Sequence, residues 1–345
     1  MDSVIQTIQS LSNIPGVPGD EGAVRDEIIN ITNPHCEYEI DPLGNLLAFK
    51  KGPKSGPRIM LSAHMDEVGL IITHIEQDGL LRCAPVGSID SRVAFGRAVE
   101  IGKDRLPGVI GGVAVHHLTT KEKKAPPEWD KLLIDIGARD AREAAQHVAP
   151  GDRAVFASEF ARLGEDYIIG RALDNRAGCA LLIELIRTGL PCDCHFAFTV
   201  QEETGCVGGG TAAHTLRPDF AIVVETTTAA DIPDTPTEKQ VCKLGGGPVL
   251  SFMDKGALYD RELYSLAHQV ARQRGIPCQS KSLVAGGNES RTVQMAGGGV
   301  RVLAVSMPCR YLHSPNLVLH RSDIENTLTL LSALAQEIAK LGASR

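Results

Sequence analysis

The sequence predicts an α/β fold, in which a mostly parallel sheet is flanked by helices and a small β domain is inserted into the chain. After residue 166, short apolar runs alternate with segments of helical periodicity, as strands and crossover helices do. Residues 67–165 instead contain short β-like runs rich in glycine and valine. The 345 residues also exceed one ordinary core. We therefore expect one domain formed by residues 1–66 and 166–345, and an inserted β-rich domain over residues 67–165.

The first part of the chain is predicted to contain a helix and a buried strand. The helix covers Ser3 to Leu11, because its apolar residues share one face and Ser3 with Gln6 forms a capping-box pattern. The strand covers the apolar run from Arg58 to Ala63. This strand leads directly into His64.

The inserted part is predicted to be built from short strands. Its candidates are residues 68–74, 79–84, 99–101, 108–110 and 153–156. The stretch from Leu118 to Trp129 is polar and contains Pro126 and Pro127, so it is predicted to be a surface loop.

The last part is predicted to alternate strands with helices. Ser322 is a candidate cap for the final helix, because acidic residues follow it in the first turn. The other expected elements are helices over 175–187 and 261–274 and strands over 195–200, 220–224 and 300–305. Such alternation is typical of a sheet covered by helices on both faces.

Composition excludes several classes of protein. A formal net charge of −7 argues against a nucleic-acid-binding surface. We find no secretory signal and no apolar stretch of about 18 residues, so we expect no membrane span. Nine cysteines, thinly spread, fit a reducing cytoplasm. Cys192 and Cys194 lack partners at zinc-finger spacing, and no glycine run sits between a strand and a helix as a dinucleotide site requires.

Histidine and acidic residues follow the ends of the predicted strands. These residues are His64, the pair Glu202 and Glu203, Glu225 and His313, while Asp174 stands just before a helix. Singly, each has an ordinary explanation, such as a loop histidine, a solvated turn or a helix cap. Because ligands bind beyond the carboxyl ends of strands in open α/β sheets, we expect all of them to meet in one crevice. Adjacent carboxylates at the end of an apolar strand also require a positive partner.

Two histidines and three carboxylates suit divalent ions such as zinc, cobalt or manganese. One carboxylate must bridge if two ions are bound about 3.5–4 Å apart, and Asp174 is our choice. Asp66 is placed to hydrogen-bond the imidazole of His64 and fix its tautomer. Glu202, next to a ligand but not needed as one, is free to take a proton from the attacking water.

Four segments make the chain resemble the M42 family of metallo-aminopeptidases. They are Ser62-Ala63-His64-Met65-Asp66-Glu67-Val68-Gly69, Arg171-Ala172-Leu173-Asp174-Asn175-Arg176, Val200-Gln201-Glu202-Glu203-Thr204-Gly205 and Tyr311-Leu312-His313-Ser314-Pro315. The resemblance implies a zinc-peptidase-like fold and two metal ions per subunit. One ion would be held by His64 and Glu225 and the other by Glu203 and His313, with Asp174 bridging, Asp66 orienting His64 and Glu202 as base and acid. It also implies that residues 67–165 drive dimerisation, and that dimers assemble into a hollow dodecamer.

The sequence departs from many members of that family at two places. Glu225 stands where many have aspartate, which conserves the charge. The segment Gly286-Gly287-Asn288-Glu289-Ser290 replaces Gly-Gly-Thr-Asp-Ala near the substrate. If Glu289 faces the pocket, it should disfavour acidic amino-terminal residues. Alternatively, Glu289 faces solvent or pairs with Arg291 or Arg301.

Two other functions compete with release of an amino-terminal residue from short peptides. A glycoside hydrolase is suggested by endoglucanase names within the same family, but it needs two positioned carboxylates and no metal. A non-catalytic metal-binding shell is the third hypothesis, and the spare base Glu202 argues against it. Loss of activity on chelation would distinguish the peptidase from the glycosidase.

Overall fold

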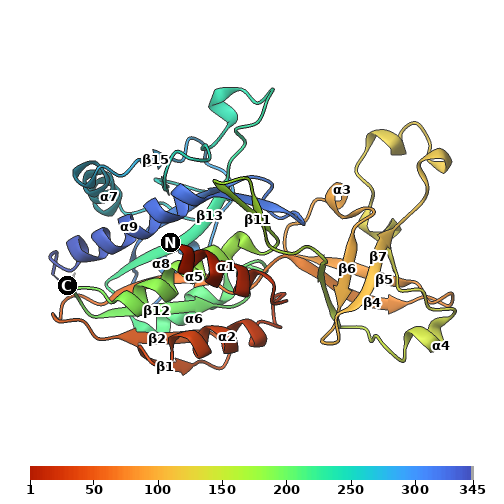
Figure 1. Cartoon of the computed structure of the whole chain (residues 1–345), viewed down its shortest axis with the longest axis horizontal. Helices are drawn as coiled ribbons and strands as arrows, with labels where there is room; N and C mark the ends of the chain where they lie inside the picture. Colours follow the sequence, from red (N-terminus) through yellow and green to blue (C-terminus); the bar gives the residue numbers. More distant parts are fainter. Residues whose placement is uncertain (343–345) are drawn as a thin grey trace.

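The computed structural model describes residues 1–342, and its larger part is built on an eight-stranded sheet (Figure 1). In order across the sheet, the strands are β1 (Glu37–Ile40), β2 (Leu46–Lys50), β12 (Cys194–Thr199), β3 (Ile59–His64), β13 (Phe220–Thr228), β16 (Arg301–Cys309), β14 (Val249–Leu250) and β15 (Gln279–Ser280).

The four central strands β12, β3, β13 and β16 run parallel. Their register places Thr199 beside His64 and Glu225 beside Ser306. The carboxyl ends of these strands therefore lie along one edge of the sheet. This edge is where the predicted site residues follow.

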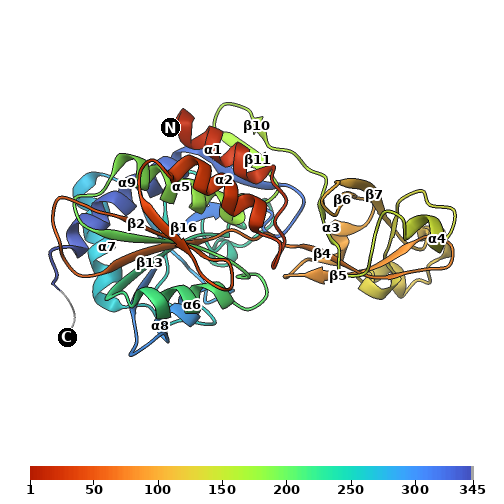
Figure 2. The same cartoon turned by 90° about the horizontal axis from the view of Figure 1, so that it is seen from below.

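Helices cover both faces of the sheet (Figure 2). Buried side chains of five helices share the main core on one face, and those of two helices share a smaller core on the other. The first set is α1 (Asp2–Ser12), α2 (Gly22–Thr32), α5 (Leu173–Thr188), α7 (Arg261–Arg274) and α9 (Arg321–Ile338), and the second is α6 (Val207–Leu216) and α8 (Ser290–Gln294). Alternate residues of the strands supply both cores, as a sheet buried on two sides requires.

A closed six-stranded barrel projects to one side of this body (Figure 1). Its strands in order are β4 (Gly69–Ile75), β5 (Leu81–Val86), β8 (Leu133–Asp135), β7 (Leu106–Gly111), β6 (Ala98–Ile101) and β9 (Arg153–Phe156). The barrel has a hydrophobic core of its own. Short helices α3 (Ser91–Ala94) and α4 (Ala141–Ala144), and 3-10 turns at Val115–His117, Glu122–Lys124 and Trp129–Lys131, decorate it.

A third sheet joins the chain leaving the barrel to the larger part. Strands β10 (Ala161–Leu163), β11 (Tyr167–Gly170) and β17 (Leu317–His320) pair antiparallel. All barrel strands fall within residues 67–165, whereas β10 pairs, through β11, with the carboxyl-terminal part of the chain. A last 3-10 turn covers Thr237–Lys239.

The predicted fold class is confirmed, but two predicted helix caps are wrong. The first helix begins after Met1 and has no side-chain cap, so Ser3 and Gln6 form no capping box. The final helix is capped by His320, whose Nδ1 accepts a hydrogen bond from the backbone N–H of Ser322. In both places the chain turns into the helix earlier than the sequence pattern indicated.

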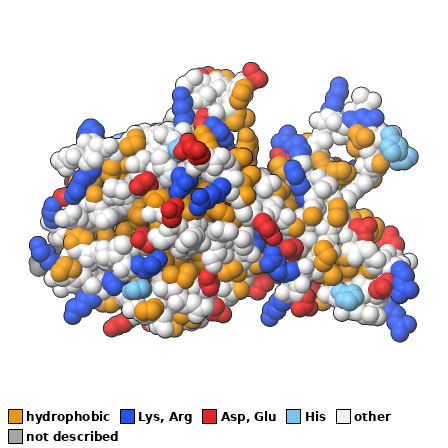
Figure 3. Space-filling view, viewed as in Figure 1, with side chains coloured by type: hydrophobic (Ala, Val, Ile, Leu, Met, Phe, Trp, Pro, Cys, Tyr) orange, Lys and Arg blue, Asp and Glu red, His pale blue; other side chains and the backbone are white. Residues whose placement is uncertain are grey.

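Charges of both signs are interspersed on the face of the molecule shown in Figure 3. Within residues 1–342, no helix is long and apolar enough to cross a membrane.

Candidate metal centre and active site

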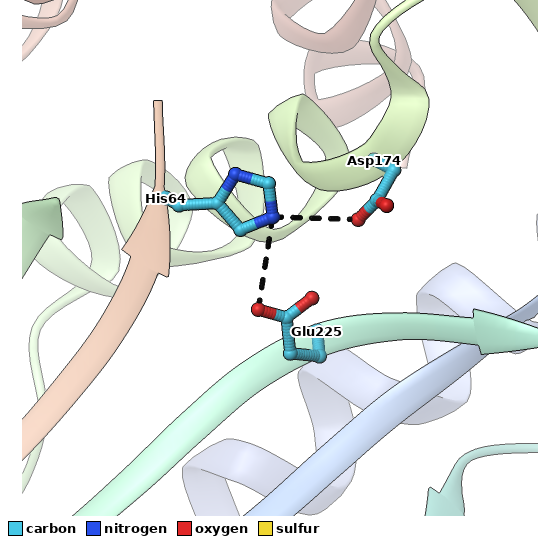
Figure 4. Close-up of side chains that lie close together, drawn as sticks. All are labelled: His64, Asp174 and Glu225. Atoms are coloured by element: carbon cyan, nitrogen blue, oxygen red, sulfur yellow. Dashed lines mark ion pairs between the residues drawn. The ribbon is translucent and has the colours of Figure 1, made fainter. Parts of the chain in front are cut away.

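His64, the last residue of β3, lies at the centre of a buried group of three side chains. Its Nε2 atom is 3.5 Å from Oδ1 of Asp174 and 3.7 Å from Oε1 of Glu225 (Figure 4). Asp174 stands in the first turn of α5, and Glu225 projects from β13. Three separate elements therefore direct one nitrogen and two oxygens to a common point.

A second group of three side chains shares Asp174 with the first. The other carboxylate oxygen of Asp174, Oδ2, is 3.4 Å from Nε2 of His313, and Oε1 of Glu203 is 3.3 Å from the same nitrogen. The ligand-type atoms within each group of three lie within 4.8 Å of one another. Asp174 thus presents one oxygen to each histidine, the placement that a bridging carboxylate needs.

Backbone carbonyls fix the outer nitrogens of both histidines. Nδ1 of His64 is 3.0 Å from the carbonyl oxygen of Asp66, and Nδ1 of His313 is 3.0 Å from that of Ser88. With Nδ1–H donating to a carbonyl, Nε2 is left as the free lone pair in each ring. Ser88 follows barrel strand β5, so the barrel side of the chain takes part in orienting His313.

Asp66 is buried and links the two parts of the cluster. Its oxygens accept hydrogen bonds from the backbone amides of Glu202 and Glu203, both at 3.0 Å. The carboxylate is farther, 3.6 Å, from Nδ1 of His64. Asp66 therefore orients His64 through its backbone carbonyl, while its carboxylate positions the loop after β12.

Glu202 borders the cluster without belonging to the two groups that share Asp174. Within the described chain, one side chain donates to its carboxylate: Sγ of Cys206 is 3.3 Å from Oε1. Burial raises the pKa of Glu202 to about 8, and the neighbouring acids Glu203 and Asp66 add to the effect against the opposing charge of His64. A carboxyl group in this setting is suited to accept and return a proton near neutral pH.

The electrostatics of the cluster favour added positive charge. Burial raises the pKa of both Glu203 and Glu225, and nearby carboxylates raise each further. For His313, burial opposes the charged ring, but hydrogen bonds that the ring donates to the carboxylates of Asp174 and Glu203 outweigh it and raise its pKa to about 11. The surrounding carboxylates therefore favour positive charge at this place.

The donor set fits divalent metal ions. Oδ1 of Asp174 and Oε1 of Glu225 are buried and have no hydrogen-bond partner, which is costly for a carboxylate unless a cation meets it. Imidazole nitrogens and carboxylate oxygens together are ligands of zinc, cobalt and manganese. The residues present therefore suit a pair of such ions.

A cavity of about 640 Å³ opens beside the cluster. The cluster residues His64, Asp174, Glu202, Glu203, Glu225 and His313 all line it. Other lining residues that the sequence reasoning missed include Ser88, Cys206, Thr226 and Lys281. Thr226 and Cys206 could have been marked in advance only by their closeness in sequence to Glu225 and Glu202. No sequence motif includes Lys281.

Glu289 adopts none of the arrangements considered from the sequence. The residue is fully buried and does not line the cavity. Its Oε2 accepts a hydrogen bond from Thr199 at 2.7 Å, and it pairs with neither Arg291 nor Arg301. The neighbouring Asn288 lines the cavity, whereas the side chain of Glu289 is buried beside Thr199.

Comparison with known proteins identifies the family. Residues 44–330 match the family model described as M42 glutamyl aminopeptidase. Lysyl aminopeptidase of Pyrococcus furiosus is 32% identical over 343 residues, covering 96% of this chain and 97% of that relative. An aminopeptidase of Desulfurococcus kamchatkensis superposes with a TM-score of 0.93 at 30% identity, covering 99% and 96% of the two chains. The TET1 peptidase of Pyrococcus horikoshii superposes with a TM-score of 0.85 at 37% identity, covering 96% of this chain and 99% of that chain. The chain therefore belongs to the M42 family of aminopeptidases.

Proposed function

We propose that this M42 aminopeptidase binds two divalent ions in the shared cluster and uses them to release the amino-terminal residue of short peptides. His64 and Glu225 would hold one ion, and Glu203 and His313 the other, with Asp174 contributing an oxygen to each. The observation that carries the proposal is the pair of side-chain groups that meet at Asp174. Zinc or cobalt, with manganese also suited, matches these ligands.

The residues around the cluster supply the proton transfers. Two ions at this position would polarise the scissile carbonyl and make a water molecule more acidic. Glu202 accepts a proton from the attacking water at Oε2, because Oε1 already faces the thiol of Cys206. It then returns the proton to the departing amine. Asp66 keeps Glu202 in place through the backbone amide that it accepts.

The alternative functions receive less support from the geometry. A glycosidase places two carboxylates on either side of a sugar bond without metal, whereas three of the acids here lie within reach of a histidine nitrogen. A shell without catalysis has no use for Glu202, whose side chain faces the cavity beside the cluster.

We also propose that residues 67–165 mediate assembly into dimers and then into a dodecamer. The solved TET1 peptidase of Pyrococcus horikoshii is described as assembling into a tetrahedron or a large octahedral shell. In this chain the barrel segment carries exposed apolar side chains, namely Phe95, Val109, Val113 and Val115. Such side chains in one small domain favour a protein interface. A cytoplasmic location is consistent with the nine free cysteines.

The test is a panel of aminoacyl anilides assayed after complete chelation and after return of zinc, cobalt or manganese. We expect no hydrolysis of the chelated protein and recovery with at least one metal at about two ions per chain. Equal hydrolysis before and after chelation would refute the two-metal assignment. Release of sugar from a glucan by the chelated protein would instead favour the glycosidase.

A further inference from the structure

One wall of the cavity beside the cluster carries a lysine that has no acidic partner. Lys281 follows β15, and its backbone N–H donates to the carbonyl of Leu250 in β14 at 2.9 Å. The next residue, Ser282, bonds to the carbonyl of Val241 through both its backbone and its hydroxyl. The backbone of Lys281 is therefore held on both sides, which fixes the point from which its side chain enters the cavity.

Lys281 is half-buried, yet within the described chain no carboxylate lies within 4.0 Å of its ammonium group. Burial lowers its pKa, against the attraction of Asp254 and Glu225. Asp254 is occupied elsewhere, because it accepts hydrogen bonds from two backbone amides and from the hydroxyl of Tyr259. An ammonium group that loses water without gaining a partner is costly unless a ligand supplies the negative charge.

The surrounding charges on this wall have the same sign. Lys255 and Arg291 also line the cavity, and both are exposed. Apart from the acids of the cluster, the lining contains one carboxylate, Asp90, and its oxygens are paired with Arg92. Three cations therefore line the same cavity as the cluster.

A second unpaired polar group lines the cavity next to a cluster residue. The hydroxyl of Thr226 is buried without a hydrogen-bond partner, and Thr226 lines the cavity. It follows Glu225 directly on β13, so it borders the place where the scissile bond would be held.

From this arrangement we propose that the cavity is the pocket for the amino-terminal side chain of the substrate, and that Lys281 selects an acidic one, glutamyl or aspartyl. The inference rests on the proposed aminopeptidase function. Family membership does not decide it, since the matching family model is described as glutamyl aminopeptidase and a similar relative is a lysyl aminopeptidase. The inference is the opposite of the expectation that Glu289 disfavours acidic amino-terminal residues. Glu289 is buried and does not line the cavity, whereas Lys281, Lys255 and Arg291 do.

The experiment compares glutamyl, glutaminyl, leucyl and lysyl anilides on the metal-loaded wild type and on Lys281→Met. The glutaminyl substrate has the same shape as the glutamyl one without its charge. We expect the wild type to prefer glutamyl over glutaminyl by at least about tenfold in kcat/KM. Lys281→Met should reduce that ratio by at least about tenfold, because one charged partner is lost.

Two further variants make the result specific. Lys281→Arg keeps the charge and should keep the preference for glutamyl. Lys243→Met removes an exposed lysine outside the cavity and should leave kcat/KM for all four anilides unchanged. Metal content and thermal midpoint are measured for each protein, and inhibition by free L-glutamate against L-glutamine gives a second readout. For the wild type, glutamate should be the stronger inhibitor.

The possible outcomes separate this inference from the function on which it rests. If the wild type cleaves glutaminyl or lysyl anilides as well as glutamyl, the acidic pocket is refuted and the aminopeptidase stands. If Lys281→Met lowers glutamyl and leucyl hydrolysis equally, Lys281 does not select the side chain. If the wild type cleaves no anilide with any of the three metals, the proposed function fails and this inference with it.

Discussion

Replacing Asp66 with asparagine tests how the loop after β12 is held at the cluster. In the wild type both carboxylate oxygens accept backbone amides, those of Glu202 and Glu203, at 3.0 Å. Asparagine has one such oxygen, and its NH₂ group would face the other backbone N–H. The backbone amide of either Glu202 or Glu203 therefore loses its hydrogen-bond acceptor.

The structure sets the expected magnitude. A hydrogen bond to a charged group contributes about 1.5–3 kcal/mol, and a buried N–H left without a partner costs about 1–3 kcal/mol. Because Asp66 is fully buried, water cannot replace the lost acceptor. We expect the free energy of unfolding to fall by about 2–4 kcal/mol. We also expect metal affinity or turnover to fall about 10–100-fold, as it does when residues that hydrogen-bond to metal ligands are replaced.

A matched control is available in Asp323. This aspartate is also fully buried, and its two oxygens accept the backbone amides of Gly245 and Gly247, both at 2.7 Å. It does not line the active-site cavity. Asp323→Asn should therefore destabilise the protein by a similar amount and leave metal binding intact.

The assay measures denaturant midpoints, metal affinity with a competing chelator, and kcat on the preferred anilide for both variants. A fall in metal affinity and kcat for Asp66→Asn alone is the expected result. If the two variants lose stability and activity alike, Asp66 acts only as a structural acceptor. If Asp66→Asn changes nothing, the hydrogen bonds to the loop do not matter.

Three further predictions concern the cluster and the barrel. Glu202→Gln should keep the metals and lose about 10²–10⁴-fold in turnover, because an amide cannot accept a proton, and retention of a tenth of the activity would exclude Glu202 as the base. Asp174→Ala should lose both ions together whereas His64→Ala mainly empties one site, so one ion at full occupancy in Asp174→Ala, by elemental analysis, would refute bridging. Shortening residues 118–129 should change the oligomer mass in light scattering before metal content, and equal metal loss would contradict this separation.

The sequence was most informative where local pattern and tertiary position coincide. The apolar run before His64 and the run before Glu225 are buried on both sides in the central sheet, so hydrophobicity alone marks them as strands. Because parallel strands end along one edge, the order of those runs was enough to bring His64, Glu225 and the acids after β12 together.

Other features depend on contacts that no local pattern carries. Strands β14 and β15 have two residues each and exist only through pairing in the sheet, and Lys281 owes its place to them. The direction of Glu289 depends on how α8 packs against α6, where the side chain lies close to Gly209. The cap at His320 arises because β17 leads straight into α9.

The contact between His313 and Ser88 has a consequence for the modularity of the molecule. Ser88 and the neighbouring Gly87, which lies against Glu203, both follow barrel strand β5, so a loop within the barrel segment forms part of the support of the cluster. A shorter chain without the barrel would keep every proposed metal ligand, but the imidazole of His313 would lose its contact with the carbonyl of Ser88. If the barrel mediates assembly as proposed, a shift of the barrel on docking would move the carbonyl of Ser88 and with it the ring of His313.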